Sequence, residues 1–590
     1  MYQKQIYFFI TLPAATLILS FLMLVVAPGR GAGWMVDDGL FLANAWNFIH
    51  GFGLDGMLPQ QPVYLVNALF MHFGLTEILH QRYAYYVFWV IGSWVFFSSL
   101  DYRQFSSLVI IAVIASLCIG FSSVLVGGVF FPFGAGCYFY SNRSQGFNRV
   151  LLISASGFLF AVAAFMHIGF AIGISIIVIF IYWLDSPIRR SIFLPVFIAS
   201  TVFFWVLYLN ELGIERFFSE PAGHKADPMH LVGNGLRIIW FFLLPVLAFY
   251  LLATFFKAKG LKQYKYSQYT LSLLVTVIYC LKFFGAQLVS IFPGFFVTLF
   301  SGRYSEVALT KAHSLVVDAP GSIYYILFFI VCRWFSESGC WQLWSTFRHP
   351  VNALETLRNF LNEDLRRKYF FIAIAGLCLL PAGYAGGSAS SIAIVLSASS
   401  GPVLGITFLI WQFIEKEKTG KIFYILLFSW CSIFIVFAAR MNLPTFESII
   451  FRPNLVTLGD SPLRGIKETV QYRDAVLKLR HAYVANACEK KRLILLDYVP
   501  IVHLLLQHEV PNHYGVVRPG VYFPEKKLMQ ELDSQFGWCV LDVTTDETRV
   551  MMRGGDIRDG VRARVIEEGR GAITLPSPSN DIKALTLYIK

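Results

Sequence analysis

Two adjacent carboxylates, Asp37 and Asp38, stand in the stretch WMVDDGLFLANAWNFIHGFG (34–53), directly after the first hydrophobic segment of the chain. Both are well placed to cap a helix over about 39–50, which Gly51 could end. Capping needs only one carboxylate, and a second raises the electrostatic cost near a membrane surface. A carboxylate held there is suited to act as a general base that takes a proton from a hydroxyl group. The pair is therefore the first candidate for chemistry.

The composition indicates which kind of protein must position this pair. Of 590 residues, 56% are hydrophobic and only 14% are charged, whereas soluble proteins carry about a quarter charged residues. A polytopic α-helical membrane protein is the class that fits. The first segment, 6–27, is too long for the core of a signal peptide, and we expect it to remain as a helix that starts in the cytoplasm. The net charge of +12 reflects basic cytoplasmic loops rather than a nucleic-acid partner.

About thirteen segments are long and apolar enough to cross a bilayer, which needs roughly 20 residues. Two continuous runs, 105–141 and 150–184, are far too long for one crossing at about 1.5 Å per residue. We therefore divide them near Gly120 and near His167–Gly169. The predicted spans are 6–27, 84–100, 105–121, 124–141, 150–166, 168–184, 191–209, 236–256, 269–290, 321–336, 369–385, 392–414 and 422–440.

Lysine and arginine are unevenly distributed between alternate loops. If the chain starts inside, the inner loops hold many more of them than the outer loops, which is the positive-inside bias. An odd number of spans then places the C-terminal residues on the same outer side as the first outer loop, 28–83. The inner loops include Arg143, Arg149, Arg189, Arg190, Lys257, Arg366, Arg367 and Lys368, and the outer loops hold Arg30, Arg82, Arg216, Lys225, Arg237, Arg303 and Lys311.

The composition changes after the spans, so we divide the chain into a transmembrane domain, 1–450, and an extracytoplasmic α/β domain, 451–590. The sequence predicts a strand leading into a helix over 492–506, strands over 537–545 and 582–590, and a helix within 472–491. Cys488 and Cys539 both lie in this domain. An even pair in an oxidising compartment could form a disulfide, but the sequence does not give their distance in space, so that question stays open.

With these features in view, the chain resembles the GT-C superfamily of membrane glycosyltransferases, which use polyprenyl-phosphate sugars. In that superfamily the first outer loop follows the first span and carries an acidic motif, as DDGLFLANAWNFIHGFGL (37–54) does here. The form is closest to the arabinofuranosyl- and mannosyl-transferring branches. The stretches DSPLRGIKETVQYRDAVLKLR and RLILLDYVPIVHLLLQHEVP are also similar to the extracytoplasmic domain of many bacterial members.

The resemblance implies a site and a reaction. The catalytic carboxylate of the family falls on Asp37 by position, with Asp38 the next candidate. The implied chemistry is inverting transfer, in which one Asp takes the proton from an acceptor hydroxyl as its oxygen attacks the anomeric carbon and lipid phosphate departs. The departing phosphate needs a cationic partner. Two outer loops offer candidates. One holds Arg303, Lys311 and His313, and the other holds Arg216, His224, Lys225 and His230. The alternative for each of them is a solvated loop residue.

Several further residues carry alternatives that the sequence leaves open. Lys282 lies inside a predicted span, either as a functional charge or with its side chain reaching toward the interface. His167 lies at a predicted break, where a packed or hydrogen-bonded histidine is expected. Some members of the superfamily hold a divalent cation at the acidic motif, to which Asp37, Asp38 and His50 could contribute, but no metal-ligand spacing is specific enough to assign one. The stretch 345–369 is expected to form a basic helix on the inner membrane surface.

The resulting hypothesis is a glycosyltransferase of a bacterial inner membrane. It would move a sugar from a polyprenyl-phosphate donor to an envelope glycan, lipid or protein outside the cytoplasm, in contact with membrane lipid. One alternative is a multi-spanning transporter or flippase for lipid-linked glycans, which would favour related halves and paired charges at mid-membrane. Another is a non-catalytic scaffold of envelope assembly. The sequence names neither the sugar nor the acceptor.

Overall fold

The structure is a computed structural model of the chain. It describes residues 37–51, 62–99, 126–219, 455–496, 501–507, 532–533, 537–545, 555–569, 571–578 and 582–590, and single residues between 355 and 380. The described residues are mostly helical. The number of spans and the division into two domains stay predictions, because the remaining spans lie outside these ranges.

Five long helices coincide with predicted spans. Most of their residues are apolar. α7 and α9 are long and apolar enough to cross a membrane, while α8 is a shorter apolar helix. Pro187 occupies the first turn of α9, where its missing N–H costs nothing, and Gly213 ends that helix with φ 89°. The helices are α4 (Ile78–Ser99), α6 (Val126–Tyr140), α7 (Gly146–Phe165), α8 (Ile168–Leu184) and α9 (Pro187–Leu212), followed by the short α10 (Ile214–Ser219).

The predicted break in the run 150–184 is confirmed at His167. α7 ends at Phe165 and α8 begins at Ile168. Between them His167 adopts an extended backbone, and its Nδ1 accepts a hydrogen bond of 2.9 Å from the backbone N–H of Gly169. The ring is buried. His167 is thus a packed, hydrogen-bonded residue that begins α8, as the sequence suggested.

The helices approach closely where glycine faces a neighbouring backbone. A Cβ added to Gly136 of α6 would lie 2.6 Å from the backbone nitrogen of Phe96 in α4. Ser156 of α7 donates a hydrogen bond of 2.8 Å to the carbonyl of Gly134 in α6. Small residues and interhelical hydrogen bonds of this kind are the means by which helices associate in lipid, where the hydrophobic effect does not drive them together.

A buried cluster of charges joins three segments at one end of the helices. Asp185, just after α8, receives a 2.9 Å hydrogen bond from Nζ of Lys368 and lies 3.5 Å from Nε of Arg189 in α9. Arg189 also donates to the carbonyl of Tyr138 at 3.0 Å and to Asn142. All three charged side chains are buried. Since a buried charge is costly unless it is paired, this cluster fixes the loops after α6 and α8 and the segment at 368 to one another.

Lys368 is therefore buried and does not face the inner membrane surface, where the prediction for 345–369 placed a basic helix. Its ammonium group is buried against Asp185, and it also lies 5.6 Å from the centre of the Tyr138 ring. The pattern of basic residues in that stretch suits a membrane surface, but the pattern cannot reveal a partner carboxylate 183 residues away. The rest of the stretch is described only at isolated positions.

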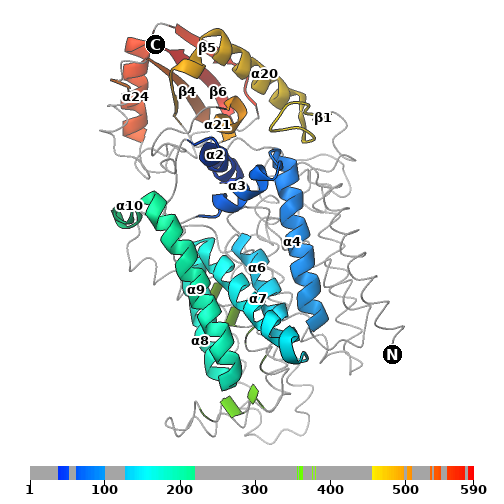
Figure 1. The fold of residues 1–590 in the computed structure, drawn as a ribbon. Coiled ribbons are helices and arrows are strands. Elements are labelled where there is room, and N and C mark those ends of the chain that lie inside the picture. The colour runs from blue at the N-terminus through cyan, green and yellow to red at the C-terminus, as the bar shows by residue number, and fades with distance from the viewer. Residues whose placement is uncertain are drawn as a thin grey trace, which may run out of the picture.

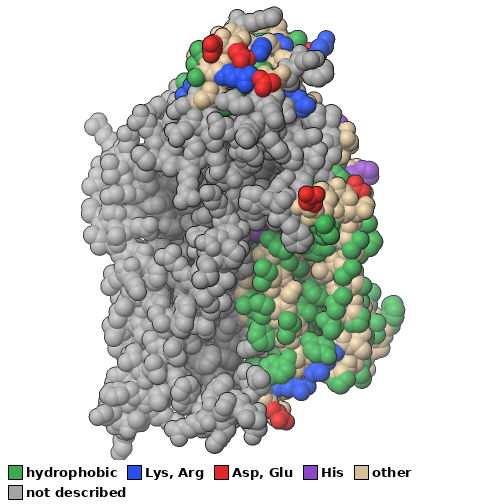
Figure 2. Space-filling model, turned by 90° about the vertical axis from the view of Figure 1, so that its left-hand side faces the viewer, with side chains coloured by type: hydrophobic (Ala, Val, Ile, Leu, Met, Phe, Trp, Pro, Cys, Tyr) green, Lys and Arg blue, Asp and Glu red, His purple; other side chains and the backbone are tan. Residues whose placement is uncertain are grey.

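The outward faces of these helices are apolar. Figure 2 shows hydrophobic side chains gathered over one side of the described helices, with lysine and arginine side chains beneath them. An exposed apolar face of this size on a protein calls for a nonaqueous partner. The exposed residues on α7, α8 and α9 include Leu151, Phe158, Ile172, Ile179, Ile198, Val202, Phe203, Val206 and Leu207.

The residues from 455 to 590, called here the C-terminal segment, contain a four-stranded sheet in the order β3-β4-β6-β5. β3 pairs parallel with β4, whereas β4 with β6 and β5 with β6 are antiparallel. Trp538, Val540, Val561 and Val565 form the centre of its buried core. The predicted strands are confirmed: β3 (Arg492–Leu495), β4 (Trp538–Thr545) and β6 (Ile582–Ile589), to which the structure adds β5 (Gly571–Leu575).

Helices and a hairpin complete the C-terminal segment (Figure 1). The predicted helix within 472–491 is α20 (Val470–Ala485), which is capped by Thr469, whose hydroxyl accepts from the N–H of Tyr472 at 3.1 Å. The predicted strand-to-helix transition ends in α21 (Ile501–Leu506). The remaining elements are the hairpin strands β1 (Leu455–Thr457) and β2 (Lys467–Thr469), the short η2 (Cys488–Lys490), and α24 (Gly555–Glu568).

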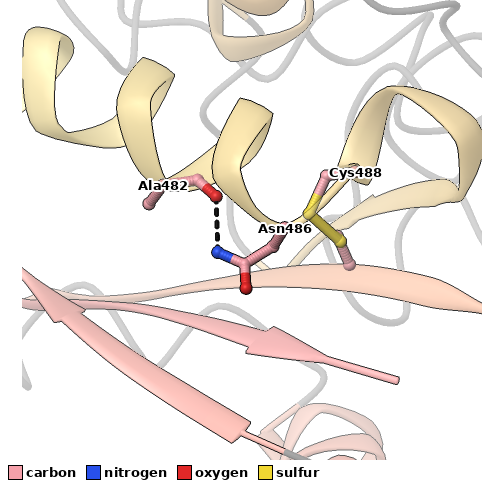
Figure 3. The surroundings of a disulfide bond; sticks show 4 residues. Ala482, Asn486 and Cys488 are labelled. Atoms are coloured by element: carbon pink, nitrogen blue, oxygen red, sulfur yellow. Dashed lines mark hydrogen bonds between the residues drawn. A yellow bond between two sulfur atoms is a disulfide. The ribbon is translucent and has the colours of Figure 1, made fainter.

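A disulfide resolves the question that the two cysteines raised. Cys488 in η2 is bonded to Cys539 in β4, so the end of α20 is covalently attached to the sheet. Figure 3 shows this attachment beside Asn486, whose side-chain amide donates a 2.7 Å hydrogen bond to the carbonyl of Ala482 at the end of α20. The sequence offered both cysteines but not their proximity, which depends on how α20 lies on the sheet.

The buried cluster predicts a coupled loss of stability. Asp185→Asn should lower the free energy of unfolding by roughly 3–5 kcal/mol, because it leaves the buried cations of Lys368 and Arg189 without their carboxylate. Lys368→Met should cost less, because Asp185 keeps its pairing with Arg189. The double variant should lose clearly less than the sum of the two. Thermal unfolding of the detergent-solubilised protein measures the effect, with Arg143→Met, at an exposed arginine nearby, as the control. Additive losses would show that the pair is not coupled.

Candidate functional site

The acidic pair opens a helix. α2 (Asp37–Ile49) begins at Asp37 itself, so the two carboxylates occupy its first turn rather than preceding it as caps. This placement is favourable, because the amide groups at a helix N-terminus carry partial positive charge. The helix ends just before Gly51, which has φ 79°, as the sequence suggested. The side chains of residues 37–40 are not among those described.

Burial along α2 falls with distance from the acidic pair. The residues from 41 to 45 are all buried, whereas Phe48 and His50 near the other end are exposed. Residues 41–45 therefore form a stretch of α2 that is enclosed by protein on every side, beginning four residues after Asp37. A general base shielded from bulk water would need surroundings of this kind.

Two asparagines, Asn44 and Asn47, are buried in this enclosed helix. Position 44 lies two turns after position 37 and so shares its face of the helix. Oδ1 of Asn44 has no hydrogen-bond partner among the described residues. A buried amide normally finds a partner, and a sugar hydroxyl is a group that an amide oxygen can accept from. Sequence reasoning overlooked Asn44, although its spacing from Asp37 was a signal.

α3 (Tyr64–His72) follows α2 and joins it to α4. Asn67 is the centre of this junction, since its Oδ1 accepts from the Tyr85 hydroxyl at 2.8 Å and its backbone carbonyl accepts from the Gln81 amide at 3.1 Å. Leu69 and Phe73 at the other side of α3 are exposed. α3 thus has polar hydrogen bonds on one side and exposed apolar groups on the other, and the placement of 61–75 along a membrane interface stays a prediction.

The C-terminal segment covers α2. α21 packs against α2, and Figure 1 shows α2 lying between the sheet and the long helices. Ile501 through Leu505, His503 included, are buried. A second contact lies at the start of α4, where the backbone N–H of Ile78 donates to the carbonyl of Pro462 at 3.1 Å. The C-terminal segment thus meets the acidic loop both at α2 and where that loop enters α4.

A cluster of charges around Tyr472 reinforces the second contact. Burial and the Glu468 carboxylate hold the pKa of Tyr472 well above its usual value, while Arg82 of α4 and Arg480 of α20 act in the opposite direction. Arg82 and Glu468 are both buried. The electrostatic influence of Arg82 on Tyr472 requires that α4 and α20 lie near each other, so this polar cluster spans the junction between them.

The structure places the predicted site residues in four different ways. Asp37 and Asp38 lie together at the start of the enclosed helix. His50 lies at the far end of α2, about 20 Å along the helix axis, where its Nδ1 hydrogen bonds to the carbonyl of Trp46 at 2.8 Å and its ring stacks on Trp46; the structure does not bring it to the acidic pair. Arg216 lies on α10, with its side chain outside the described residues. The others, Lys225, Lys282, Arg303, Lys311 and His313, lie outside the described ranges altogether.

The described residues contain no group of three or more His, Cys, Asp or Glu side chains that could hold a metal ion. Because the side chains of Asp37 and Asp38 are not among those described, the question of a divalent cation at the acidic motif is as open as the sequence left it. The features that sequence reasoning missed are Asn44 on α2 and the cover provided by α21.

Comparison with known proteins adds no family to this picture. No protein-family model matches the chain, and no characterised protein or solved structure matches it at a significant level. The site is therefore interpreted from its own geometry.

Proposed function

We propose that the chain is a membrane glycosyltransferase of the GT-C type, which moves a sugar from a polyprenyl-phosphate donor to an acceptor outside the cytoplasm. The observation that carries the proposal is the helix α2, which begins with Asp37 and Asp38 and is buried over residues 41–45. It lies between the apolar helices and the C-terminal segment, where a lipid-borne sugar and a polar acceptor would meet.

Features at the two ends of the long helices support placing this site on the outer side of the membrane. The Cys488–Cys539 disulfide is typical of an oxidising compartment, and the segment that carries it contacts α2. The cluster of Asp185, Arg189 and Lys368 lies at the opposite end, since α9 runs about 30 Å from Arg189 to Tyr208, whose ring meets Tyr64 of α3. An outer acidic site and inner basic loops, in a bacterial inner membrane, agree with both observations.

In the proposed reaction Asp37 accepts the proton of an acceptor hydroxyl while its oxygen attacks the anomeric carbon. The bond between that carbon and the lipid phosphate breaks, and the sugar is transferred with inversion. Asp38 is the next candidate for the base. Enclosure of α2 excludes water, which would otherwise compete with the acceptor as the nucleophile. The amide of Asn44, two turns along the same face, is suited to orient a hydroxyl of either substrate.

The described structure does not favour the transporter alternative. Transport proteins commonly place paired charges near the middle of the membrane. The buried pair found among the described residues, Asp185 with Lys368, instead lies at the ends of α8 and α9, where it joins loops. A scaffold without activity would not need two carboxylates in an enclosed helix, and so it explains α2 less well.

The base assignment predicts that Asp37→Asn lowers transfer by about a hundredfold to ten-thousandfold, the contribution that a general base usually makes. Membranes supplied with a radiolabelled polyprenyl-phosphate sugar measure it, with protein level followed by immunoblot. Asp474→Asn, which changes a half-exposed carboxylate in α20, is the matched control and should transfer normally. Full activity of Asp37→Asn would refute the enzyme proposal.

The sidedness predicts opposite results for two reporter fusions. A reporter enzyme whose folding needs disulfides should be active after Lys590, because disulfides form outside the cytoplasm, and inactive after Gln145 in the loop before α7. A reporter that fluoresces only in the cytoplasm should give the reverse. A cytoplasmic signal at Lys590 would contradict the shared side of α2 and the C-terminal segment.

A further inference from the structure

The guanidinium of Arg480 in α20 binds two separate parts of the backbone. Its Nε donates to the carbonyl of Leu505 at 3.0 Å, and one Nη donates to the carbonyl of Ser461 at 2.7 Å. The other Nη lies 3.4 Å from the carboxylate of Asp460, and the side chain is only 24% exposed. A planar group with donors in fixed directions is suited to hold two such segments at once, whereas a lysine is not.

Both segments contact the acidic loop or the start of α4, which follows it. Leu505 belongs to α21, which packs against α2. Ser461 precedes Pro462, whose carbonyl accepts from the N–H of Ile78 at the start of α4. In the same turn Gly465 lies against Leu79, so closely that an added Cβ would be 2.9 Å from its Cδ2. One side chain therefore links the cover of α2 to the turn that rests on α4.

The helix that carries Arg480 is itself firmly held. Thr469 caps its first turn, and the disulfide from Cys488 attaches the residues just after it to β4. Leu479 beside Arg480 is fully buried. These attachments restrain α20 from moving with α21 or with the turn. A displacement of either segment would therefore break its hydrogen bond to Arg480.

We propose that Arg480 is a positioning residue for α2: it fixes α21 and the 460–465 turn relative to each other and so holds the acidic helix in place. The effect on catalysis rests on the proposed function of Asp37, whereas the effect on the order of α2 does not. Arg480 contacts no substrate in this proposal and acts only through the two backbone segments.

Hydrogen–deuterium exchange of the full-length protein in detergent tests the positioning role without any assay of activity. Loss of hydrogen bonds from a charged group should make local opening about tenfold more frequent. In Arg480→Ala, amides of α2 over 41–49 and of α21 should exchange correspondingly faster, while β4 and β6 remain as protected as in the parent. Arg473→Ala is the matched control, since Arg473 lies on the same helix and pairs with the adjacent Asp474 rather than with α21 or the 460–465 turn.

Arg480→Lys keeps the charge but not the fork of donors, and it should show the same local change to a smaller extent, which keeps the test decisive if the alanine variant does not fold. Unchanged exchange in α2, or equally faster exchange in β4 and β6, would overturn the positioning role. Transfer from polyprenyl-phosphate sugar should fall in Arg480→Ala and not in Arg473→Ala. If Asp37→Asn retains full transfer, the proposed function fails while the exchange result still decides the role of Arg480.

Discussion

The packing of α2 against α21 is the contact on which the candidate site depends, because it encloses a helix that would otherwise lie open to water. About three quarters of the chain separates the two helices, yet they pack together, and residues 41–45 of α2 and 501–505 of α21 are buried. A carboxylate at the start of an enclosed helix can act on a bound hydroxyl without competition from solvent. The same carboxylate on an exposed loop would only be hydrated.

Buried polar and charged groups join different parts of the chain at the two ends of the long helices. Near α2 the buried polar groups, among them Arg82, Glu468 and Asn44, lie where chain segments from both halves of the sequence meet. At the other end Asp185 neutralises two cations and joins loops. The first arrangement brings distant segments around a helix that carries potential chemistry. The second joins the loops after α6 and α8 to the segment at 368.

Much of the local structure could be predicted from the sequence, for physical reasons that are plain in particular elements. The run 150–184 is too long for one crossing, and a polar His167 inside it marks the break, which the structure confirms. Alternation and β-branched residues identified β4 and β6. These signals are local, because the length of an apolar run, its hydropathy and the residues that break it can all be read from neighbouring positions in the sequence.

The contacts that assemble the site could not be predicted in this way. The pairing of Lys368 with Asp185, the two carbonyls held by Arg480 and the bond between Cys488 and Cys539 each join residues far apart in sequence. An isolated lysine or arginine in a basic stretch looks the same whether it faces lipid headgroups or a buried carboxylate. These cases differ only in how the chain folds in three dimensions, which the local patterns of one sequence do not reveal.

The distance along the chain between α2 and α21 also bears on how the protein matures. A ribosome adds roughly 5–20 residues each second, so α2 leaves it tens of seconds before the helix that will cover it. During that interval the apolar face of α2 that is later buried against α21 has no packing partner. A nascent chain stalled short of residue 500 would leave that face exposed. The acidic helix is thus made well before its cover and is enclosed only after α21 has been synthesised, which ties any activity to synthesis through α21.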